Sequence, residues 1–174
     1  MSEKLSASSK RDVSKILSEL AVVFDSMVGL ASQGDFLIGE AHRLLRAPRH
    51  RARGTKPSVL VVDDDQRILR SVERTLKGKF TITRAATVTE AIELVRSVPF
   101  DAIVADYNLN EGTGVDILRV ALREQPDATR VLHTAQPASL LPRQIPSHLI
   151  QHVVFKPAPE GELARVLLES IAAD

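Results

Sequence analysis

Four short apolar runs in this chain each lead into an acidic, hydroxyl or basic side chain. The runs cover residues 58–62, 102–105, 130–133 and 152–155. Runs of this length that are rich in Val, Ile and Leu, and that are separated by segments of helical period, are typical of buried parallel strands. A parallel sheet binds ligands just beyond the carboxyl ends of its strands, where the strand order reverses. The runs therefore predict a sheet that gathers polar side chains along one edge.

The side chains that follow these runs have complementary chemistry. They are Asp63, Asp64, Asp106, Thr134 and Lys156. Carboxylates crowded at one edge repel one another, so such a pocket favours a bound cation. A hard divalent metal takes oxygen ligands, and it neutralises the charge of a phosphoryl group that approaches a carboxylate. We therefore predict a phosphoryl-transfer site built around a divalent metal.

The composition limits the alternatives. The 174 residues suffice for one domain with an appendage or for two very small domains. Apolar residues make up 44% and aromatic residues only 3%, so the core must be aliphatic. The absence of cysteine excludes disulfides and thiol chemistry and is compatible with a reducing compartment. No apolar run approaches the roughly 18 residues of a membrane span, and the N-terminus lacks the apolar core of a secretory signal. We therefore expect a cytoplasmic protein.

The chain divides into three parts. They are a helical N-terminal region over 1–46, a basic linker with Pro and Gly over 47–57, and an α/β domain over 58–174. The apolar residues of the first part recur at spacings of three and four, which predicts an α-helical hairpin. This hairpin either packs on the rest of its own chain or, because its apolar stripe is wide, self-associates. We expect a homodimer through residues 9–46, with a modest coiled-coil signal.

The third part alternates strands with helices. Strands are predicted over 58–62, 80–82, 102–105, 130–133 and 152–155, and helices over about 66–77, around 91–95, over 114–123 and over about 160–172. Three prolines between residues 135 and 149 prevent a long unbroken helix there. Repeated right-handed crossovers of this length predict a doubly wound parallel sheet.

Four motifs in this part resemble the response regulator receiver domain of bacterial two-component signalling. The motifs are Val61-Val62-Asp63-Asp64-Asp65, Asp106-Tyr107-Asn108-Leu109 with Gly114 eight residues after Asp106, Thr134-Ala135, and Lys156-Pro157. The resemblance covers about 58–172 and rests on the order of all four motifs, because any one of them alone is weak. It implies a five-stranded parallel, flavodoxin-like sheet, preceded here by the helical hairpin.

The resemblance also implies what the site does. Asp106 accepts a phosphoryl group from the phosphohistidine of a sensor histidine kinase or phosphotransfer protein, and forms an acyl phosphate. Thr134 donates a hydrogen bond to a phosphoryl oxygen. Lys156 pairs with another phosphoryl oxygen, or with Asp106 before transfer. The peptide bond between Lys156 and Pro157 is expected to be cis.

The implied cofactor is Mg²⁺. Asp64 and Asp106 bind it directly, and the main-chain carbonyl of Asn108 is its third protein ligand. Asp63 acts mostly through a metal-bound water. The expected activity is limited to assisting the protein's own phosphorylation and dephosphorylation, so we do not expect an enzyme.

Four nearby residues have structural interpretations. Asp65 is expected to cap the following helix, and Gly114 to allow a backbone bend at a helix start. By strand alternation, His133 and His152 are expected to face away from the site as structural histidines. No second ligand at metal-like spacing accompanies either histidine, so a zinc site is not supported.

Three departures from the family pattern affect the readout of phosphorylation. The aromatic residue usual three positions before the lysine is Val153, and the proline usual four positions after the acceptor is Asn110. The segment after Thr134, usually a helix of the signalling face, holds three prolines. The chemistry is therefore expected to be intact and the readout altered.

No DNA-binding or enzymatic domain is recognised after residue 173, so we expect output through the N-terminal region, through a partner, or by passing phosphate onward. Two alternatives stay open. One is nucleic-acid binding through the basic segment 43–56, which has phosphate affinity but no aromatic platform or recognition helix. The other is a receiver-like scaffold that is never phosphorylated.

Overall fold

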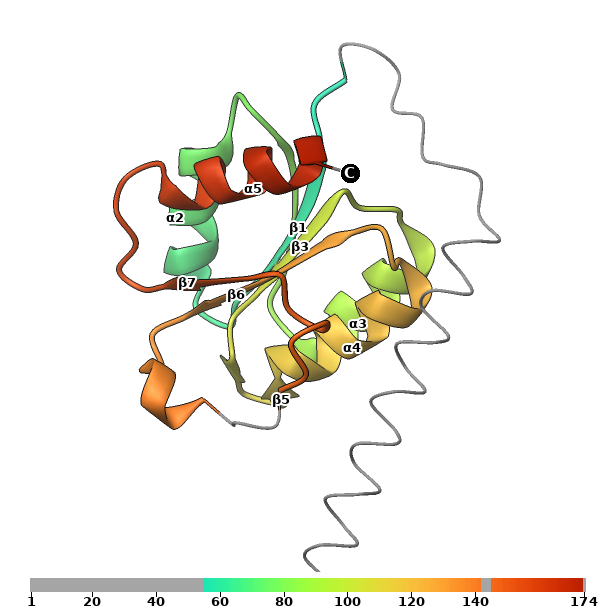
Figure 1. Ribbon diagram of the computed structural model, residues 1–174, viewed down its shortest axis with the longest axis vertical. Helices are drawn as coiled ribbons and strands as arrows, with labels where there is room; N and C mark the ends of the chain where they lie inside the picture. The colour runs from blue at the N-terminus through green and yellow to red at the C-terminus, as the bar shows by residue number, and fades with distance from the viewer. Residues whose placement is uncertain (1–54, 142–144, 174) are drawn as a thin grey trace, which may run out of the picture. The chain divides into compact units, whose positions relative to one another are not determined.

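The computed structural model describes residues 55–141 and 145–173, which are drawn in colour in Figure 1. The helical hairpin and the dimer contact predicted for residues 9–46 lie outside the described residues. So does almost all of the basic segment 43–56. These interpretations stay predictions.

Five parallel strands form the central sheet, in the order β2-β1-β3-β6-β7. Their bounds are Ser58–Val62 (β1), Thr81–Ala85 (β2), Ala102–Ala105 (β3), Thr129–Thr134 (β6) and His152–Phe155 (β7). The chain passes from β1 outward to β2 and then returns to β3 on the other side of β1. The strand order therefore reverses between β1 and β3, and sheets of this kind hold ligands beyond such a reversal. The predicted five-stranded, doubly wound α/β fold is confirmed.

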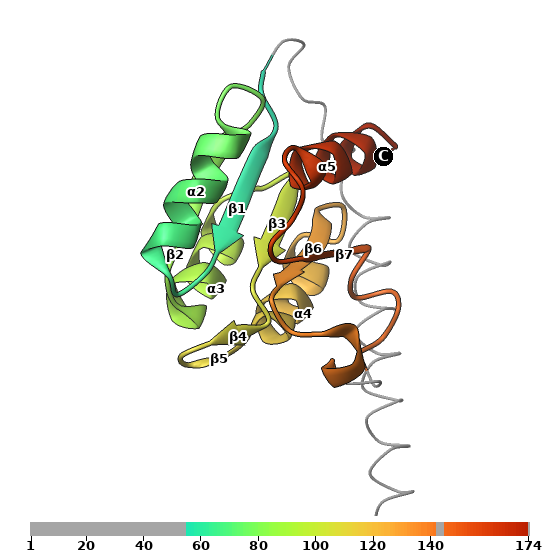
Figure 2. The ribbon, with the colours of Figure 1, turned by 90° about the vertical axis from the view of Figure 1, so that its left-hand side faces the viewer.

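Helices of the described residues cover both faces of the sheet, as Figures 1 and 2 show. Helices α2 (Gln66–Leu76) and α5 (Glu162–Ala173) lie on one face, and α3 (Val88–Ser97) and α4 (Gly114–Glu124) lie on the other. Polar residues fix two of the helix starts: the side chain of Thr87 accepts a hydrogen bond from the amide of Glu90, and Thr113 forms a capping box with Asp116. Within the described ranges, no helix has both the length and the apolar character needed to cross a membrane.

Strand β1 shows why the sheet strands are continuously apolar. Leu60 and Val62 pack in the core under α3 and α4, whereas Val59 and Val61 pack in the core under α2 and α5. All four side chains are at most 2% exposed. Because both faces of the sheet are covered here, β1 is apolar at each of these four positions.

The predicted bounds agree with the structure to within a few residues, except at the second strand. The prediction of 80–82 is wrong in where the strand starts and ends, since the pairing with β1 runs over Thr81–Ala85. Phe80 instead forms an isolated bridge with Lys77 and is buried. Strand β2 lies at the edge of the sheet and is mostly half-buried or exposed. Its apolar signal is therefore weak.

A small antiparallel hairpin after β3 was not predicted. It pairs β4 (Asn108–Leu109) with β5 (Gly112–Thr113), and strands of two residues leave no periodic pattern in the sequence. After β6 the chain forms the short 3-10 helix η1 (Ala138–Leu140). In the described part of 135–149, η1 is the only helical element, in keeping with the prolines there.

Candidate metal and phosphoryl-acceptor site

Three carboxylates come together at the carboxyl ends of β1 and β3. In the parallel ladder Val62 pairs with Ala105, and the amide of Asp106 donates to the carbonyl of Val62 at 2.9 Å. The residues that follow these two strands are thereby set side by side. One oxygen from each of Asp63, Asp64 and Asp106 lies within 4.8 Å of the others. The three acidic residues predicted as metal ligands therefore form one cluster.

The carboxylate of Asp106 is incompletely satisfied. Its Oδ1 is buried without a hydrogen-bond partner, and it is the only such side-chain atom within the described ranges. Burial raises the pKa of Asp106, and the positive charge of Lys156 partly opposes this rise. An orphaned carboxylate oxygen beside two other carboxylates suits a hard cation that takes oxygen ligands, and this donor set fits Mg²⁺.

Lys156 supplies the positive charge of the cluster. Its Nζ lies 2.5 Å from Oδ2 of Asp63 and 3.3 Å from Oδ2 of Asp106. All three side chains are mostly buried, at 13%, 4% and 14% exposed for Lys156, Asp63 and Asp106. The amide of Lys156 donates to the carbonyl of Thr134 at 2.8 Å, which anchors the end of β7 to the end of β6. The peptide bond to Pro157 is cis, as predicted.

Thr134 is the last residue of β6 and is fully buried. Its Oγ1 accepts a hydrogen bond from the amide of Gln136 at 3.0 Å, which leaves the hydroxyl hydrogen as a donor. The side chain of Asn108 donates from Nδ2 to Oε1 of Gln136 at 3.1 Å. Sequence reasoning did not single out Gln136. The available signal was its position two residues after the site threonine.

Asp65 follows Asp64 in the chain, but it caps a helix instead of joining the carboxylate cluster. It is the N-cap of α2, and its Oδ1 accepts a hydrogen bond from the amide of Arg67 at 2.7 Å. The Arg67 side chain bonds the same carboxylate and lowers the pKa of Asp65 to about 2. The helix-capping role predicted for Asp65 is confirmed.

Gly114 is required for a different reason from the one predicted. A Cβ at this position would overlap the main-chain carbonyl oxygen of Asp106. The amide of Gly114 also donates to the carbonyl of Tyr107 at 3.0 Å. The start of α4 therefore lies directly against the backbone of the candidate acceptor. Close approach, rather than a glycine-specific bend, excludes a side chain here.

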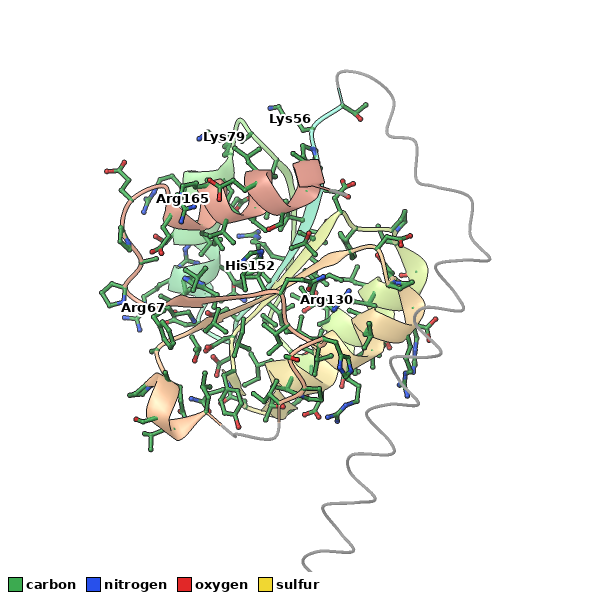
Figure 3. All side chains as sticks on the ribbon, viewed as in Figure 1. Lys56, Arg67, Lys79, Arg130, His152 and Arg165 are labelled. Atoms are coloured by element: carbon green, nitrogen blue, oxygen red, sulfur yellow. The ribbon has the colours of Figure 1, made fainter. Side chains whose placement is uncertain are left out.

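Of the two histidines on the strands, His133 is buried and His152 is half-buried. His152 lies on β7, next to α5 (Figure 3). Its Nε2 is 2.6 Å from the hydroxyl of Ser170 on α5. His133 is buried on the face of β6 that meets α2, beside a cavity of about 420 Å³. Burial, aided by the charge of Lys156, lowers the pKa of His133 to about 4. The prediction that His133 faces away from the site is therefore incomplete, because the site's charges reach it.

The departures from the family pattern lie at exposed positions outside the carboxylate cluster. Val153 on β7 is 41% exposed and Phe155 is 42% exposed, and Leu140 of η1 is 64% exposed. Asn110 lies in the exposed turn of the hairpin between β4 and β5. None of these residues contributes to the carboxylate cluster.

Comparison with known proteins places these observations in a family. The family model described as "Response regulator receiver domain" matches residues 59–168. The photosynthetic apparatus regulatory protein RegA of Rhodovulum sulfidophilum is 34% identical over 82 residues, which is 47% of this chain and 45% of RegA. The match thus spans less than half of that relative's length.

Solved structures share the fold. The signal receiver domain of an HD domain-containing protein from Pseudomonas fluorescens Pf-5 superposes with a TM-score of 0.61 at 26% identity, covering 69% of this chain and 100% of that domain. A response regulator protein from Burkholderia pseudomallei, solved with a phosphorylated aspartic acid, a calcium ion and citrate, superposes with a TM-score of 0.59 at 21% identity. That match covers 68% of this chain and 70% of the Burkholderia protein. With a family match over more than half of its length and this fold, the chain belongs to the response regulator receiver domain family.

Proposed function

We propose that this protein is a two-component response regulator that accepts a phosphoryl group on Asp106 from a sensor histidine kinase or phosphotransfer protein. One observation carries the proposal: the orphaned Oδ1 of Asp106 lies in a cluster with Asp63 and Asp64 and beside the ammonium of Lys156. A cluster with a purely structural role would pair its buried oxygens. This one keeps an oxygen available at the edge where such sheets hold ligands.

The proposed transfer needs no reactant besides the phosphohistidine and a proton from water. A carboxylate oxygen of Asp106 attacks the phosphorus of the donor phosphohistidine. The new O–P bond forms as the P–N bond breaks, and the electron pair of the P–N bond leaves on the donor imidazole, which takes up a proton. The product on this chain is an acyl phosphate.

The cluster repels a phosphoryl group unless its charge is compensated. When bound, Mg²⁺ supplies that compensation between the carboxylates and the phosphoryl oxygens. We propose Asp64, Asp106 and the main-chain carbonyl of Asn108 as its protein ligands. Asp63 already bonds Lys156 and, at 2.9 Å, the amide of Asp65. These contacts support an indirect role for Asp63, through a water.

Lys156 and Thr134 complete the proposed site. The Lys156 ammonium lies between two carboxylates, so a small movement would bring it to a phosphoryl oxygen carried by Asp106. Thr134 ends the strand next to β3, and its hydroxyl hydrogen remains a donor. Both groups thus favour the phosphorylated state by charge and by hydrogen bonding.

The test replaces the acceptor and follows the covalent product. Wild-type protein incubated with acetyl phosphate and Mg²⁺ should gain the mass of one phosphoryl group, and Asp106→Asn should gain none. Because burial raises the pKa of Asp106, its charge destabilises the fold at neutral pH, so Asp106→Asn should also increase the free energy of unfolding.

The matched control is Asp127→Asn, the same change in the turn that precedes β6, at the amino end of that strand. It should be phosphorylated like the wild type. A mass increase that persists in Asp106→Asn would refute the acceptor assignment. Failure of the wild type to form any adduct would favour the unphosphorylated scaffold.

We further propose that the signal leaves through protein contacts, in the cytoplasm, and that the chain forms a homodimer through residues 9–46. The support for the dimer is the wide apolar stripe in the sequence of that region. Light scattering should give a dimer for the full chain and a monomer after deletion of residues 1–46. A dimer that survives the deletion would move the interface into the receiver domain.

A further inference from the structure

Gln136 bonds three separate segments at the mouth of the candidate site. Its amide donates to Oγ1 of Thr134 at 3.0 Å, at the end of β6. Its Oε1 accepts from Nδ2 of Asn108 at 3.1 Å, in the hairpin that follows the acceptor. Its Nε2 donates to the carbonyl of Leu140 at 3.2 Å, in η1. Both polar ends of the side chain are therefore engaged.

The hydrogen bond to Asn108 connects Gln136 to a residue of the proposed Mg²⁺ site. The side chain of Asn108 is exposed and extends from a strand of only two residues. Such a short hairpin has little rigidity of its own. The hydrogen bond to Gln136 tethers it to the loop that follows β6. The carbonyl of the same Asn108 residue is the main-chain ligand in the proposed Mg²⁺ site, so the tether restricts the position of that ligand.

The bond to Leu140 fixes the other end of the tether. A glutamine side chain has several rotatable bonds, and ordering it costs conformational entropy. Since Nε2 is held by the carbonyl of Leu140, Oε1 is presented to Asn108 in one orientation. The amide of Gln136 meanwhile holds Thr134 as a hydrogen-bond donor. One residue thus orders two groups of the proposed site.

We propose that Gln136 is a positioning residue for the Mg²⁺ site: its side chain clamps the Asn108 hairpin against η1 and so preorganises the Asn108 carbonyl as a metal ligand. This inference rests on the proposed function only in identifying the ion. The clamp acts on metal binding before any phosphoryl transfer, so the two can fail separately.

The test measures Mg²⁺ binding to the unphosphorylated full-length protein by titration of backbone amide resonances. Gln136→Met keeps the length of the side chain and removes both of its hydrogen bonds. It should weaken Mg²⁺ binding about fivefold, the equivalent of one modest hydrogen bond. Asn108→Ala should have a similar effect, because it removes the other partner and keeps the main-chain carbonyl.

The double variant distinguishes a clamp from two unrelated effects. If Gln136 acts through Asn108, Gln136→Met combined with Asn108→Ala should bind Mg²⁺ no more weakly than either single variant. The matched control is Asn110→Ala, in the exposed turn of the same hairpin, which should leave Mg²⁺ binding unchanged. The urea midpoint of unfolding should stay at its wild-type value in all of these variants, since the substituted side chains are not part of the core.

Two results would overturn the inference. One is wild-type Mg²⁺ affinity in Gln136→Met. The other is a double variant whose loss is the product of the two single losses. If the wild type binds Mg²⁺ as described but forms no acyl phosphate, the proposed function fails while the clamp stands. If the wild type binds no Mg²⁺, the clamp has no ligand to position and is rejected.

Discussion

Two regions of the sheet are built differently. One is the edge at the carboxyl ends of β1 and β3, and the other is the outer side of β7, the face that carries Val153 and Phe155. At the first, Asp63 and Asp106 are mostly buried, and both contact the ammonium of Lys156, which follows β7. At the second, Val153 and Phe155 are each about two-fifths exposed among the described residues. Buried ionic groups depend strongly on the geometry of their partners, because desolvation is costly. Half-exposed apolar side chains tolerate change.

The positions of the side chains are more tightly constrained at the ends of β1 and β3 than on β7. Register between β1 and β3 fixes the carboxylates relative to one another, since both strands are central and covered on both faces. Strand β7 lies at the edge of the sheet and pairs only with β6 among the described strands. The rate of phosphorylation is therefore expected to be sensitive to substitution at the carboxyl ends of β1 and β3. Substitution of Val153 or Phe155 on β7 should leave that rate unchanged.

The largest effect is expected at Lys156. Lys156→Met leaves the buried carboxylates of Asp63 and Asp106 without their cation, which should lower the free energy of unfolding by about 4 kcal/mol in metal-free buffer. Urea unfolding measures the loss, and added Mg²⁺ should stabilise the variant more than the wild type. Lys79→Met, at an exposed position, is the control. A loss below about 1 kcal/mol would contradict the picture of a tightly coupled cluster.

Gly114→Ala should come next. Its Cβ would overlap the carbonyl oxygen of Asp106, so either α4 or the acceptor loop must shift. We expect a loss of about 3 kcal/mol, as for severe overpacking, together with slower phosphorylation of the folded fraction. At Gly78 a Cβ meets nothing within 4 Å, but φ is +104°, so Gly78→Ala should cost only about 1 kcal/mol. Equal losses at the two glycines would remove the close-contact argument.

His133 should make stability depend on pH. Its pKa is lowered to about 4 in the folded protein, from an ordinary value of 6.5, so the unfolded chain binds the proton more tightly. Stability is therefore lost as the pH falls below 6.5, by about 2 kcal/mol between pH 7 and pH 5. His133→Gln cannot take up this proton, and the difference between its urea unfolding curves and those of the wild type isolates the histidine. A difference that does not change with pH would show that His133 is not held neutral.

The smallest effect is expected on the outer side of β7. Val153→Tyr restores the aromatic residue usual in the family at a half-exposed position, and should change the free energy of unfolding by less than about 0.5 kcal/mol. Phosphorylation by acetyl phosphate should keep its wild-type rate. Val154→Tyr, one residue along but only 2% exposed, should be strongly destabilising. Slower phosphorylation in Val153→Tyr would show that the two regions are coupled.

Most of the fold could be predicted from the sequence because its strands are short apolar runs, of which β1 and β3 are buried on both faces. Strands β1, β3 and β7 have the predicted bounds, and β6 is longer by one residue at each end. The edge strand β2 was misplaced, since half-buried positions carry mixed residues. The hairpin of β4 and β5 was missed, because elements of two residues produce no periodicity.

The candidate site was predicted in part. The residue types and their positions at strand ends were sufficient to bring Asp63, Asp64, Asp106 and Lys156 together. The role of Gln136 could not be predicted, because its three hydrogen bonds depend on how two loops and η1 meet. Loops have no repeating pattern in the sequence, so the contacts between them cannot be predicted from the sequence alone.

The polar groups at the strand ends follow from the sequence alone, because apolar patterning sets where each strand ends. Parallel crossovers then bring the carboxyl ends of all the strands to one edge of the sheet. The way in which those groups pair with one another depends on the packing of the folded domain. Lys156 lies closer to Asp63 than to Asp106, an oxygen of Asp106 is left without a donor, and α4 contacts the backbone of Asp106 at Gly114. The physical reason is that strand order and register fix which residues are neighbours, whereas differences of a few tenths of an ångström among neighbours are set by the packing of the whole domain.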